Sequence, residues 1–439
     1  MFFRLKLFFL FLMVYGNAAY AICIIPQDLE QPISDKSRFE CLKNAYFLQE
    51  PKRNVSLNDV VFGPQLEDDV VFKPDEQVYC RYFYRYQNGS SNKFRCYRTN
   101  EKNILMNDKG EIVFQAQSVG AYNTEQEDYL LDQNGQIIYS HKNKPMKADV
   151  LKVRFQDGSK RHRENYASTV ASRISWILGF PMEHYYSVKN VHCFGCEKNP
   201  WNEGLKPQLQ YNPKVENSFP FASIERKNEA KRVIKAFVPQ SKKYVITPWN
   251  WNEFVKYSHQ LNAKQNLEFQ VLALYANLMQ TVENRGSQHV VLCEKKYYNK
   301  ENKTCEQTLA GTHDMGAAFG NRALVDKETK NHPRADYKAY QATVMLKPNT
   351  CELGTVPGGL IKVSEDARRE FVNRLEILNP SMIKEILRSA YFQYADLGFY
   401  NEIKKNEKLQ EPALSERVLH LWSELIYSKM QVFKNTKCL

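Results

Sequence analysis

The stretch that decides the fold reads Asn277-Leu-Met-Gln-Thr-Val-Glu283-Asn284-Arg285-Gly-Ser-Gln288-His289-Val-Val-Leu-Cys293, followed after a polar detour by Gly311-Thr-His313-Asp314-Met315-Gly316-Ala-Ala-Phe319-Gly320. We expect a helix that enters a polar loop, then a short apolar strand, a hairpin and a second loop with Asp-x-Gly. Phosphoryl transfer needs a carboxylate near the acceptor hydroxyl, an amide beside it and a second acid that reaches the magnesium ion. The order of these segments supplies all three groups.

Helical periodicity continues on both sides of this stretch. Before it, an apolar stripe recurs at helical spacing between Val271 and Val282. After it, three helices are predicted to begin at the capping residues Ser364, Asn379 and Ser415. Residues 246–439 are therefore predicted to form a helical C-terminal lobe.

The preceding part of the chain is rich in strand signals. Short β-branched and aromatic runs between Val78 and Phe155 alternate with the turns Asn88-Gly89, Asn107-Asp-Lys-Gly110 and Asp132-Gln-Asn-Gly135, which predicts antiparallel hairpins. We interpret the likeness among these hairpins as shared turn chemistry and not as an internal repeat. An extension at 22–77, a β-rich N-terminal lobe at 78–245 and the helical lobe make an α+β, two-lobed chain.

One strand and the helix after it carry charged side chains. The strand at 150–155 places Lys152 and Arg154 on one face, because side chains alternate along a strand. The helix has apolar residues at helical spacing, ends at Gly179 and carries Glu164 in its first turn. The alternative reading is an exposed strand lysine and a glutamate that the helix dipole favours.

The N-terminus predicts export. Arg4 and Lys6 precede an apolar run at 7–15, and Ala19-Tyr20-Ala21 follows it, which is the pattern of a secretory signal peptide at 1–21. The run is shorter than the ~20 residues that span a bilayer. We expect no membrane-spanning segment after cleavage and a periplasmic or secreted protein.

Ten cysteines follow the predicted cleavage site, and an even number in an exported chain favours disulfides. Three pairs have local support: Cys80 with Cys96 about the Asn88-Gly89 turn, Cys293 with Cys305 about the polar detour, and Cys193 with Cys196. The C-x-x-C of the last pair could instead be a redox motif or half a zinc site, but it lacks a βαβ context and a second ligand pair. The pairing of four cysteines stays open: Cys23, Cys41, Cys351 and Cys438.

The formal charge is +12, or +10 once Arg4 and Lys6 are removed with the signal peptide. Basic side chains crowd into 142–163 and 227–235. Such a surface could meet an anionic envelope surface or a nucleotide's phosphates, and we do not expect nucleic acid as the partner. The alternative is a solvated face that only aids solubility.

Three motifs resemble a group of uncharacterised exported bacterial proteins: Ile224-Glu-Arg-Lys227, the loop Glu283-Asn284-Arg285…Gln288…Cys293, and Asp314-Met-Gly-Ala-Ala-Phe-Gly320. Members typically show Asp-Asn-Lys or Asp-Ser-Lys in the loop and Asp-Leu-Gly-Ala-Thr-Phe-Gly in the last motif. The group is similar to the atypical kinase fold of phosphoinositide kinases, HipA-type serine kinases and CotH kinases. The resemblance covers residues 93–433, with sharp matches only in these motifs.

The resemblance implies a kinase-like protein that binds ATP and Mg²⁺. Lys152 would hold the α and β phosphates, with Arg154 as the competing choice, and Glu164 would orient that base. Glu283 would take the place of the catalytic carboxylate. Asn284 would assist metal binding, and Asp314 would ligate magnesium.

Two departures from the group's pattern affect the expected activity. Glu283 is one methylene longer than the usual aspartate, and misplacing a reacting group by ~1 Å can cost on the order of 10²-fold in rate. Arg285 replaces a lysine and cannot titrate. The expected function is phosphoryl transfer to an envelope or extracellular acceptor; the alternative is a catalytically silent envelope-binding or structural module.

Other chemistries have less support. His313 beside Asp314 suggests a metal hydrolase, but no other histidine stands at ligand spacing. Trp249 and Trp251 are expected to pack in the core or between the lobes and not to form a sugar-binding platform. The sequence contains no Gly-rich phosphate loop and no nucleophile elbow.

Overall fold

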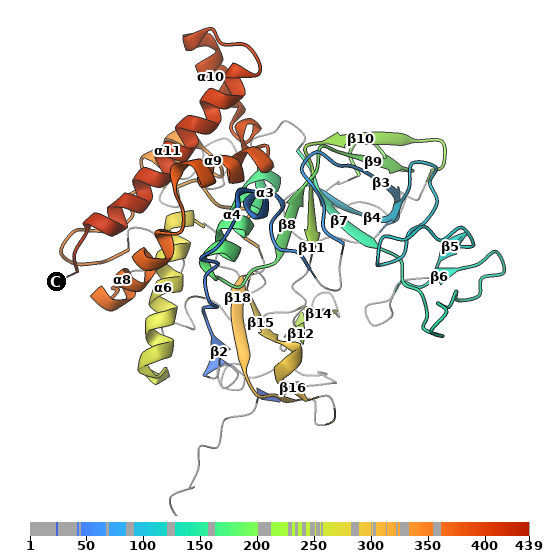
Figure 1. The fold of residues 1–439 in the computed structure, drawn as a ribbon, viewed down its shortest axis with the longest axis horizontal. Coiled ribbons are helices and arrows are strands. Elements are labelled where there is room, and N and C mark those ends of the chain that lie inside the picture. The colour runs from blue at the N-terminus through green and yellow to red at the C-terminus, as the bar shows by residue number, and fades with distance from the viewer. Residues whose placement is uncertain are drawn as a thin grey trace, which may run out of the picture.

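The computed structural model describes residues 23–24, 42–43, 45–66, 70–84, 92–120, 128–156, 163–200, 212–226, 231–232, 236–238, 243–245, 251, 255, 258–281, 289–299, 301, 304–312, 314–321, 324, 333–353 and 361–438. The α+β prediction is confirmed, with a β-rich N-terminal half and a helical C-terminal half (Figure 1). Within these ranges, none of the helices has the length and hydropathy to cross a bilayer. The predicted signal peptide at 1–21 lies outside the described residues.

The N-terminal half is built on a seven-stranded sheet with the order β10-β9-β3-β4-β7-β11-β8. Its strands are β3 (Gln77–Tyr82), β4 (Lys93–Thr99), β7 (Val150–Arg154), β8 (His184–Ser187), β9 (Asn190–Phe194), β10 (Glu216–Pro220) and β11 (Ser223–Arg226). Only the β3–β9 pair among them is parallel. The predicted hairpin about Asn88-Gly89 is the β3–β4 pair, and the predicted strand at 150–155 is β7.

The two faces of this sheet differ in chemistry, because side chains alternate along each strand. One face is an apolar core that includes Val78, Phe94, Leu151, Val153 and Ile224. The other face is charged at its centre, where cross-strand partners on β4, β7 and β11 are Lys93 with Arg154, Arg95 with Lys152, and Lys152 with Glu225.

Helix α4 (Glu164–Leu178) joins the two halves of the chain. Gly179 ends it in the left-handed conformation, as predicted, with φ of 78°. The helix belongs to a core that also holds residues of the C-terminal helices. Arg163, the residue before it, donates to the carbonyl oxygen of Ala335 at 3.1 Å and lies 3.4 Å from Asp396. The start of α4 is therefore fixed by the C-terminal half.

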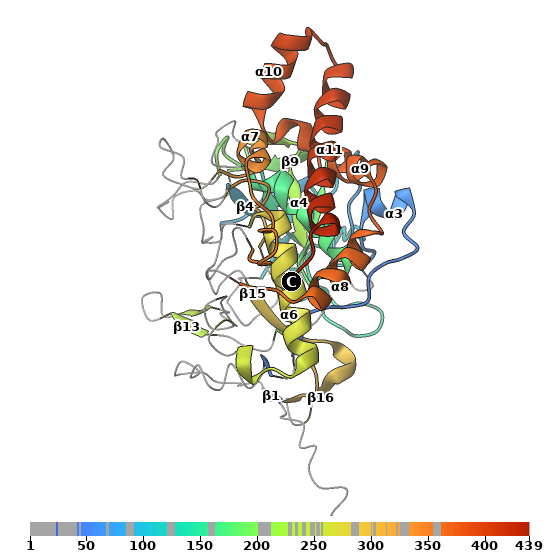
Figure 2. The same ribbon diagram turned by 90° about the vertical axis from the view of Figure 1, so that its left-hand side faces the viewer.

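The C-terminal half is mainly helical. Its helices are α6 (Ala263–Met279), α7 (Tyr337–Gln341), α8 (Glu365–Leu375), α9 (Pro380–Ser389), α10 (Leu397–Glu407) and α11 (Ala413–Asn435), while α3 (Leu57–Phe62) precedes the large sheet. Ser364 and Asn379 cap α8 and α9 as predicted. The last helix begins at Ala413, two residues before the predicted Ser415. Figure 2 shows α10 and α11 projecting together at one end of the molecule.

A second sheet lies under α6, with the order β12-β15-β18-β2. Its strands are β2 (Ala45–Tyr46), β12 (Lys231–Arg232), β15 (His289–Cys293) and β18 (Thr308–Thr312). Strand β2 ends the sheet, and side chains of α6 bond to its polar backbone: Gln265 donates to the carbonyl oxygen of Ala45 at 3.3 Å, and Glu268 accepts from the amide of Phe47 at 2.9 Å. The remaining short strands are β1 (Cys23–Ile24), β5 (Ser118–Val119), β6 (Leu130–Leu131), β13 (Ala236–Val238), β14 (Lys243–Val245), β16 (Tyr298–Asn299) and β17 (Thr304–Cys305).

The three disulfides with local support are present: Cys80–Cys96, Cys193–Cys196 and Cys293–Cys305. A fourth, Cys351–Cys438, closes a loop of 87 residues around the C-terminal helices. Cross-links of this kind stabilise chiefly by constraining the unfolded chain. Cys41 and the side chain of Cys23 lie outside the described residues.

Residues 98–149, of which 98–120 and 128–149 are described, form a separate array that we call the hairpin module. Two rings of three backbone hydrogen bonds organise it. In the first ring Met106 donates to Arg98, Asp149 to Met106 and Arg98 to Asp149, over 2.8–3.1 Å. In the second ring Ile138, Met146 and Leu130 repeat this cycle over 2.8–2.9 Å.

The turns of the hairpin module are alike in detail. The side chains of Asn107 and Asp132 each accept from the amides two and four residues ahead, at 2.8–3.0 Å. Gly110 and Gly135 then adopt φ of 78° and 75°, which favours glycine. These recurring bonds and backbone angles belong to the turns themselves, in agreement with the interpretation of shared turn chemistry.

Candidate functional site

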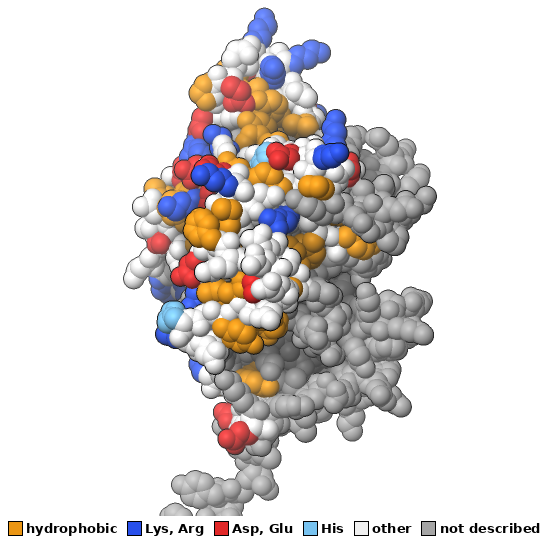
Figure 3. Space-filling view, turned by 90° about the vertical axis from the view of Figure 1, so that its right-hand side faces the viewer, with side chains coloured by type: hydrophobic (Ala, Val, Ile, Leu, Met, Phe, Trp, Pro, Cys, Tyr) orange, Lys and Arg blue, Asp and Glu red, His pale blue; other side chains and the backbone are white. Residues whose placement is uncertain are grey.

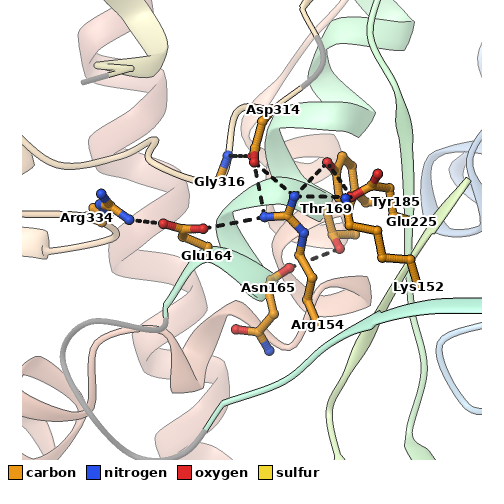
Figure 4. A network of polar contacts seen from close by, with 10 residues as sticks. All are labelled: Lys152, Arg154, Glu164, Asn165, Thr169, Tyr185, Glu225, Asp314, Gly316 and Arg334. Carbon is orange, nitrogen blue, oxygen red and sulfur yellow. Dashed lines mark hydrogen bonds and ion pairs between the residues drawn. The ribbon is translucent and has the colours of Figure 1, made fainter. Parts of the chain in front are cut away.

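The guanidinium of Arg154 is the centre of the charged sheet face (Figure 4). Its Nη2 lies 2.9 Å from Oδ2 of Asp314 and 3.1 Å from Oε2 of Glu225, and its Nη1 lies 3.4 Å from Oε2 of Glu164. Tyr185 is a further neighbour, with its hydroxyl oxygen 3.2 Å from Nη2. The side chain is 1 % exposed. Three carboxylates from three separate elements thus surround one buried cation.

Glu164 occupies the first turn of α4, as predicted. One of its oxygens contacts Arg154, and the other pairs with Arg334 from the segment before α7. Burial lowers the pKa of Arg334 to about 10. Sequence reasoning missed Arg334, because nothing in its local sequence indicates a contact with a helix about 170 residues earlier.

Lys152 contacts a different acid. Its Nζ pairs with Oε2 of Glu225 on the neighbouring strand, and the hydroxyl of Tyr185 donates to the same carboxylate at 3.2 Å. Burial lowers the pKa of Lys152, and Glu225 opposes that effect. Of the two bases proposed from the sequence, Arg154 is the one that contacts both Glu164 and Asp314. The sequence shows Glu225 only as part of the motif at 224–227 and indicates no role for it.

Asp314 approaches the sheet from a tightly packed loop. The amide of Gly316 donates to Oδ1 of Asp314 at 3.0 Å, which fixes the carboxylate. A Cβ at Gly316 would lie 2.9 Å from Cβ of Glu164 and 2.9 Å from Oγ of Ser168. The amide of Phe319 donates to the carbonyl oxygen of Met279 at the end of α6, at 2.8 Å. Glycine at position 316 therefore allows this loop to lie directly on α4.

Lys93 is a basic residue that sequence reasoning missed. It begins β4, is buried, and lies opposite Arg154 in the sheet register. Burial, together with the nearby Arg154 and Lys152, lowers the pKa of Lys93 to about 7. Asp314 and Glu225 act on it in the opposite direction. Lys93 begins the strand that follows the Asn88-Gly89 turn, which the sequence does indicate. Its approach to Arg154 depends on the register between β4 and β7, which the sequence does not indicate.

The predicted catalytic loop with Glu283 and Asn284 lies outside the described residues, as does His313. Asp314 is therefore the one predicted metal ligand whose surroundings are described. Its oxygens accept from Arg154 and Gly316. Among the described residues, no three acids, histidines or cysteines are grouped as a metal ion would require.

A half-open pocket of about 520 Å³ lies elsewhere, beside β2 and α6. None of the residues predicted from the sequence lines it. Its basic side chains already have acidic neighbours: Lys296 lies 3.0 Å from Glu294, and Arg374 lies 2.8 Å from Glu370. The Arg154 network is the stronger candidate site, because it joins both halves of the chain.

Of the comparisons with known proteins, the one with solved structures returns matches. No protein-family model matches the chain, and no curated protein matches it. Among solved structures, the proinflammatory kinase CtkA of Helicobacter pylori is similar with a TM-score of 0.33 and 11 % identity, over 72 % of this chain and 92 % of that one. A TM-score this low leaves the chemistry of the chain to be argued from its own residues.

Proposed function

We propose that this protein has an atypical-kinase-like site that binds the phosphate groups of a nucleotide against the Arg154 network. The observation that carries the proposal is the 2.9 Å contact between Nη2 of Arg154 and Oδ2 of Asp314. It joins the N-terminal sheet to the Asp-Met-Gly loop of the C-terminal half. Glu164, from the helix that follows β7, contacts the same guanidinium.

These contacts match the parts of a phosphoryl-transfer site. In protein kinases a lysine on the third strand pairs with a glutamate of the next helix, and an aspartate of a later loop holds magnesium. In the proposed site Arg154 would act as the strand base, Glu164 as the helix acid and Asp314 as the loop acid. An arginine suits this role, because its planar fork can donate to two oxygens of a phosphate at once.

The charge around the network supports an anionic ligand. Lys93, Arg95, Lys152 and Arg154 occupy facing positions on two neighbouring strands. Glu164, Glu225 and Asp314 offset part of this positive charge, and a ligand that brings negative charge between the bases would offset more of it. Adenosine, which lacks phosphate, is expected to gain nothing from this arrangement.

The reaction that we propose is transfer of a terminal phosphoryl group to a hydroxyl of an envelope or extracellular acceptor. The acceptor oxygen forms a bond to phosphorus while the bond to the leaving nucleoside diphosphate breaks. Glu283 would take the proton of the hydroxyl. Lys93, Lys152 and Arg154 would bind and orient the phosphates before and after transfer.

Asp314 and Asn284 would hold a Mg²⁺ ion, which would neutralise part of the charge of the nucleotide phosphates. The member of this donor set that the structure describes is Asp314, a carboxylate of the kind that magnesium prefers, and Arg154 and Gly316 donate to it in three hydrogen bonds.

Thermal unfolding with ligands tests the proposal. We expect ADP and ATP, each with Mg²⁺, to raise the Tm of the wild type, adenosine to leave it unchanged, and Asp314→Asn to lose the shift. Glu424→Gln is the matched control, because it removes one negative charge from an exposed position of α11. If neither nucleotide shifts the wild-type Tm, the proposed function is wrong.

A silent binding module is the second candidate. The observation that favours it is the guanidinium of Arg154, which contacts both oxygens of Asp314. Two sequence features also favour a silent module: Glu283 is longer than the usual aspartate, and Arg285 cannot titrate. Nucleotide binding without any transfer of phosphate to solvent or to the protein would select this candidate.

We further propose that the protein acts outside the cytoplasm. Its disulfides support that location, because such bonds persist in oxidising compartments. Alkylation of cell-derived protein without reductant tests this: a cytoplasmic protein would be labelled at its cysteines, and an exported one would not.

A further inference from the structure

The hairpin module repeats a short sequence whose apolar side chains face solvent. Residues 107–114 read Asn-Asp-Lys-Gly-Glu-Ile-Val-Phe, and residues 132–139 read Asp-Gln-Asn-Gly-Gln-Ile-Ile-Tyr. At equivalent positions, Ile112 and Phe114 are 41 % and 71 % exposed, and Ile137 and Tyr139 are 37 % and 54 % exposed. Val113 and Ile138, between them, face the module's own core. The repeat thus holds two large apolar side chains outward at two places.

Basic residues follow the second pair of exposed apolar side chains, Ile137 and Tyr139. From residue 136 to residue 147 the chain carries Lys142, Lys144 and Lys147 and no acid. Lys142 and Lys144 are exposed, on the turn directly after Tyr139. An aromatic ring beside exposed lysines is the combination that anchors proteins at the boundary between lipid headgroups and acyl chains.

We propose that the hairpin module docks on the surface of an anionic lipid bilayer. Phe114 and Tyr139, with Ile112 and Ile137, would enter the headgroup region, and Lys142 and Lys144 would contact lipid phosphates. Figure 3 views the molecule from the side on which β5 and β6 lie in Figure 1, and it shows hydrophobic side chains at the surface there.

A bilayer fits these residues better than a protein partner does. A stable protein interface buries roughly 800 Å² on each side around a packed centre, which is more than a few separate side chains provide. Interfacial binding needs only a few apolar groups that insert and a local positive charge that anionic lipids attract. Single exposed apolar residues are ordinary, but here an exposed Ile and an exposed aromatic side chain recur at equivalent positions of two turns in one module.

The test is co-sedimentation of the full chain with vesicles of phosphatidylcholine alone or of equal parts phosphatidylcholine and phosphatidylglycerol. We expect binding to the anionic vesicles only, weakened by added salt. Phe114→Ser combined with Tyr139→Ser is expected to lower the affinity by ~10-fold or more, and Lys142→Gln combined with Lys144→Gln by several-fold. Val344→Ser is the matched control, because Val344 is 59 % exposed in the C-terminal half.

The outcomes separate the alternatives. All of the substituted side chains are exposed, so the Tm should stay at the wild-type value and loss of binding would not mean loss of fold. Equal binding to neutral and anionic vesicles, or an equal loss in Val344→Ser, would overturn the proposal. A loss only in the lysine variant would mean that a polyanion is recognised by charge alone, and insertion would be excluded. None of these results depends on the nucleotide site.

Discussion

Arg154 and Asp314 stand 160 residues apart in the sequence, yet two of their polar atoms lie 2.9 Å apart in the fold. The first belongs to a strand of the N-terminal sheet, and the second to the loop that follows the hairpin of β15 and β18. Each would be an ordinary charged residue without the other. Their contact joins two weak sequence motifs in one candidate site, and it predicts how the protein responds when either partner is changed.

Removing the guanidinium should destabilise the protein strongly. Arg154→Met leaves Glu164, Glu225 and Asp314 without their shared cation, and breaking a buried ion pair on one side costs about 3–5 kcal/mol. Urea unfolding measures this. Combining Arg154→Met with Asp314→Asn should recover part of the loss, because one stranded charge is removed. A fully additive double variant would contradict the contact.

Lys93 should affect ligand binding without supporting the fold. Lys93→Met removes a buried cation from beside Arg154 and Lys152, so we expect the free energy of unfolding to stay constant or rise. The affinity for ADP should fall by about 10-fold, since one charged hydrogen bond to phosphate is worth about 1.5–3 kcal/mol. Lys93→Arg should keep most of the affinity. Calorimetric titration and urea unfolding separate the two effects, and lower stability without weaker binding would argue against a phosphate contact.

A methyl group at position 316 should separate the Asp-Met-Gly loop from α4. The added Cβ would meet Glu164 and Ser168 at 2.9 Å, and such overpacking costs about 1–3 kcal/mol. Gly398→Ala, at the second position of α10, is the control, because its added Cβ would lie 3.3 Å from the nearest atom, Oδ1 of Asp396, and alanine is favoured over glycine in a helix by up to about 1 kcal/mol. We expect the first variant to lower the Tm and the second to leave it unchanged or raise it. Equal Tm values for Gly316→Ala and the wild type would mean that the loop can move away from α4 without loss of stability.

Stability should fall as the pH drops below the ordinary pKa of histidine. Burial lowers the pKa of His289 to about 3, so the folded protein keeps this ring neutral while the unfolded chain binds a proton below pH ~6.5. As the pH falls, the unfolded chain therefore binds a proton that the folded protein does not bind. This proton stabilises the unfolded state, so the free energy of unfolding decreases. Between pH 7 and 5 this amounts to about 2 kcal/mol.

His289→Phe tests that effect, because phenylalanine fills the buried site beside Trp251 and does not titrate. Urea unfolding at the two pH values should show a smaller loss for the variant than for the wild type. Identical losses would mean that His289 is protonated in the folded protein as well.

Local sequence signals predicted the elements well where the cause is itself local. Ser364 and Asn379 cap their helices because their side chains accept from amides three residues ahead, and Gly179 ends α4 because glycine accepts a left-handed backbone. The turn sequences likewise located the hairpins. These local signals together predicted that the first half of the chain is rich in strands and the second half in helices.

Contacts between distant segments were predicted only in outline. The sequence placed Lys152, Arg154, Glu164 and Asp314 in one candidate site, but it did not decide which base meets which acid. That choice depends on the register of β4, β7 and β11, which sets Glu225 opposite Lys152. Lys93 and Arg334 were missed for the same reason. Each lies near the site because distant segments pack together, and a short sequence pattern does not indicate such packing.

The hydrogen bonds from side chains of α6 to the backbone at β2 affect whether another chain can pair with this strand. An open strand end normally offers its amides and carbonyls to any chain that can pair with them. Gln265 and Glu268 occupy groups of residues 45–47 that an incoming strand would need. Helix α6 thus covers this edge of the second sheet, and it binds residues 45–47 to the C-terminal half of the chain.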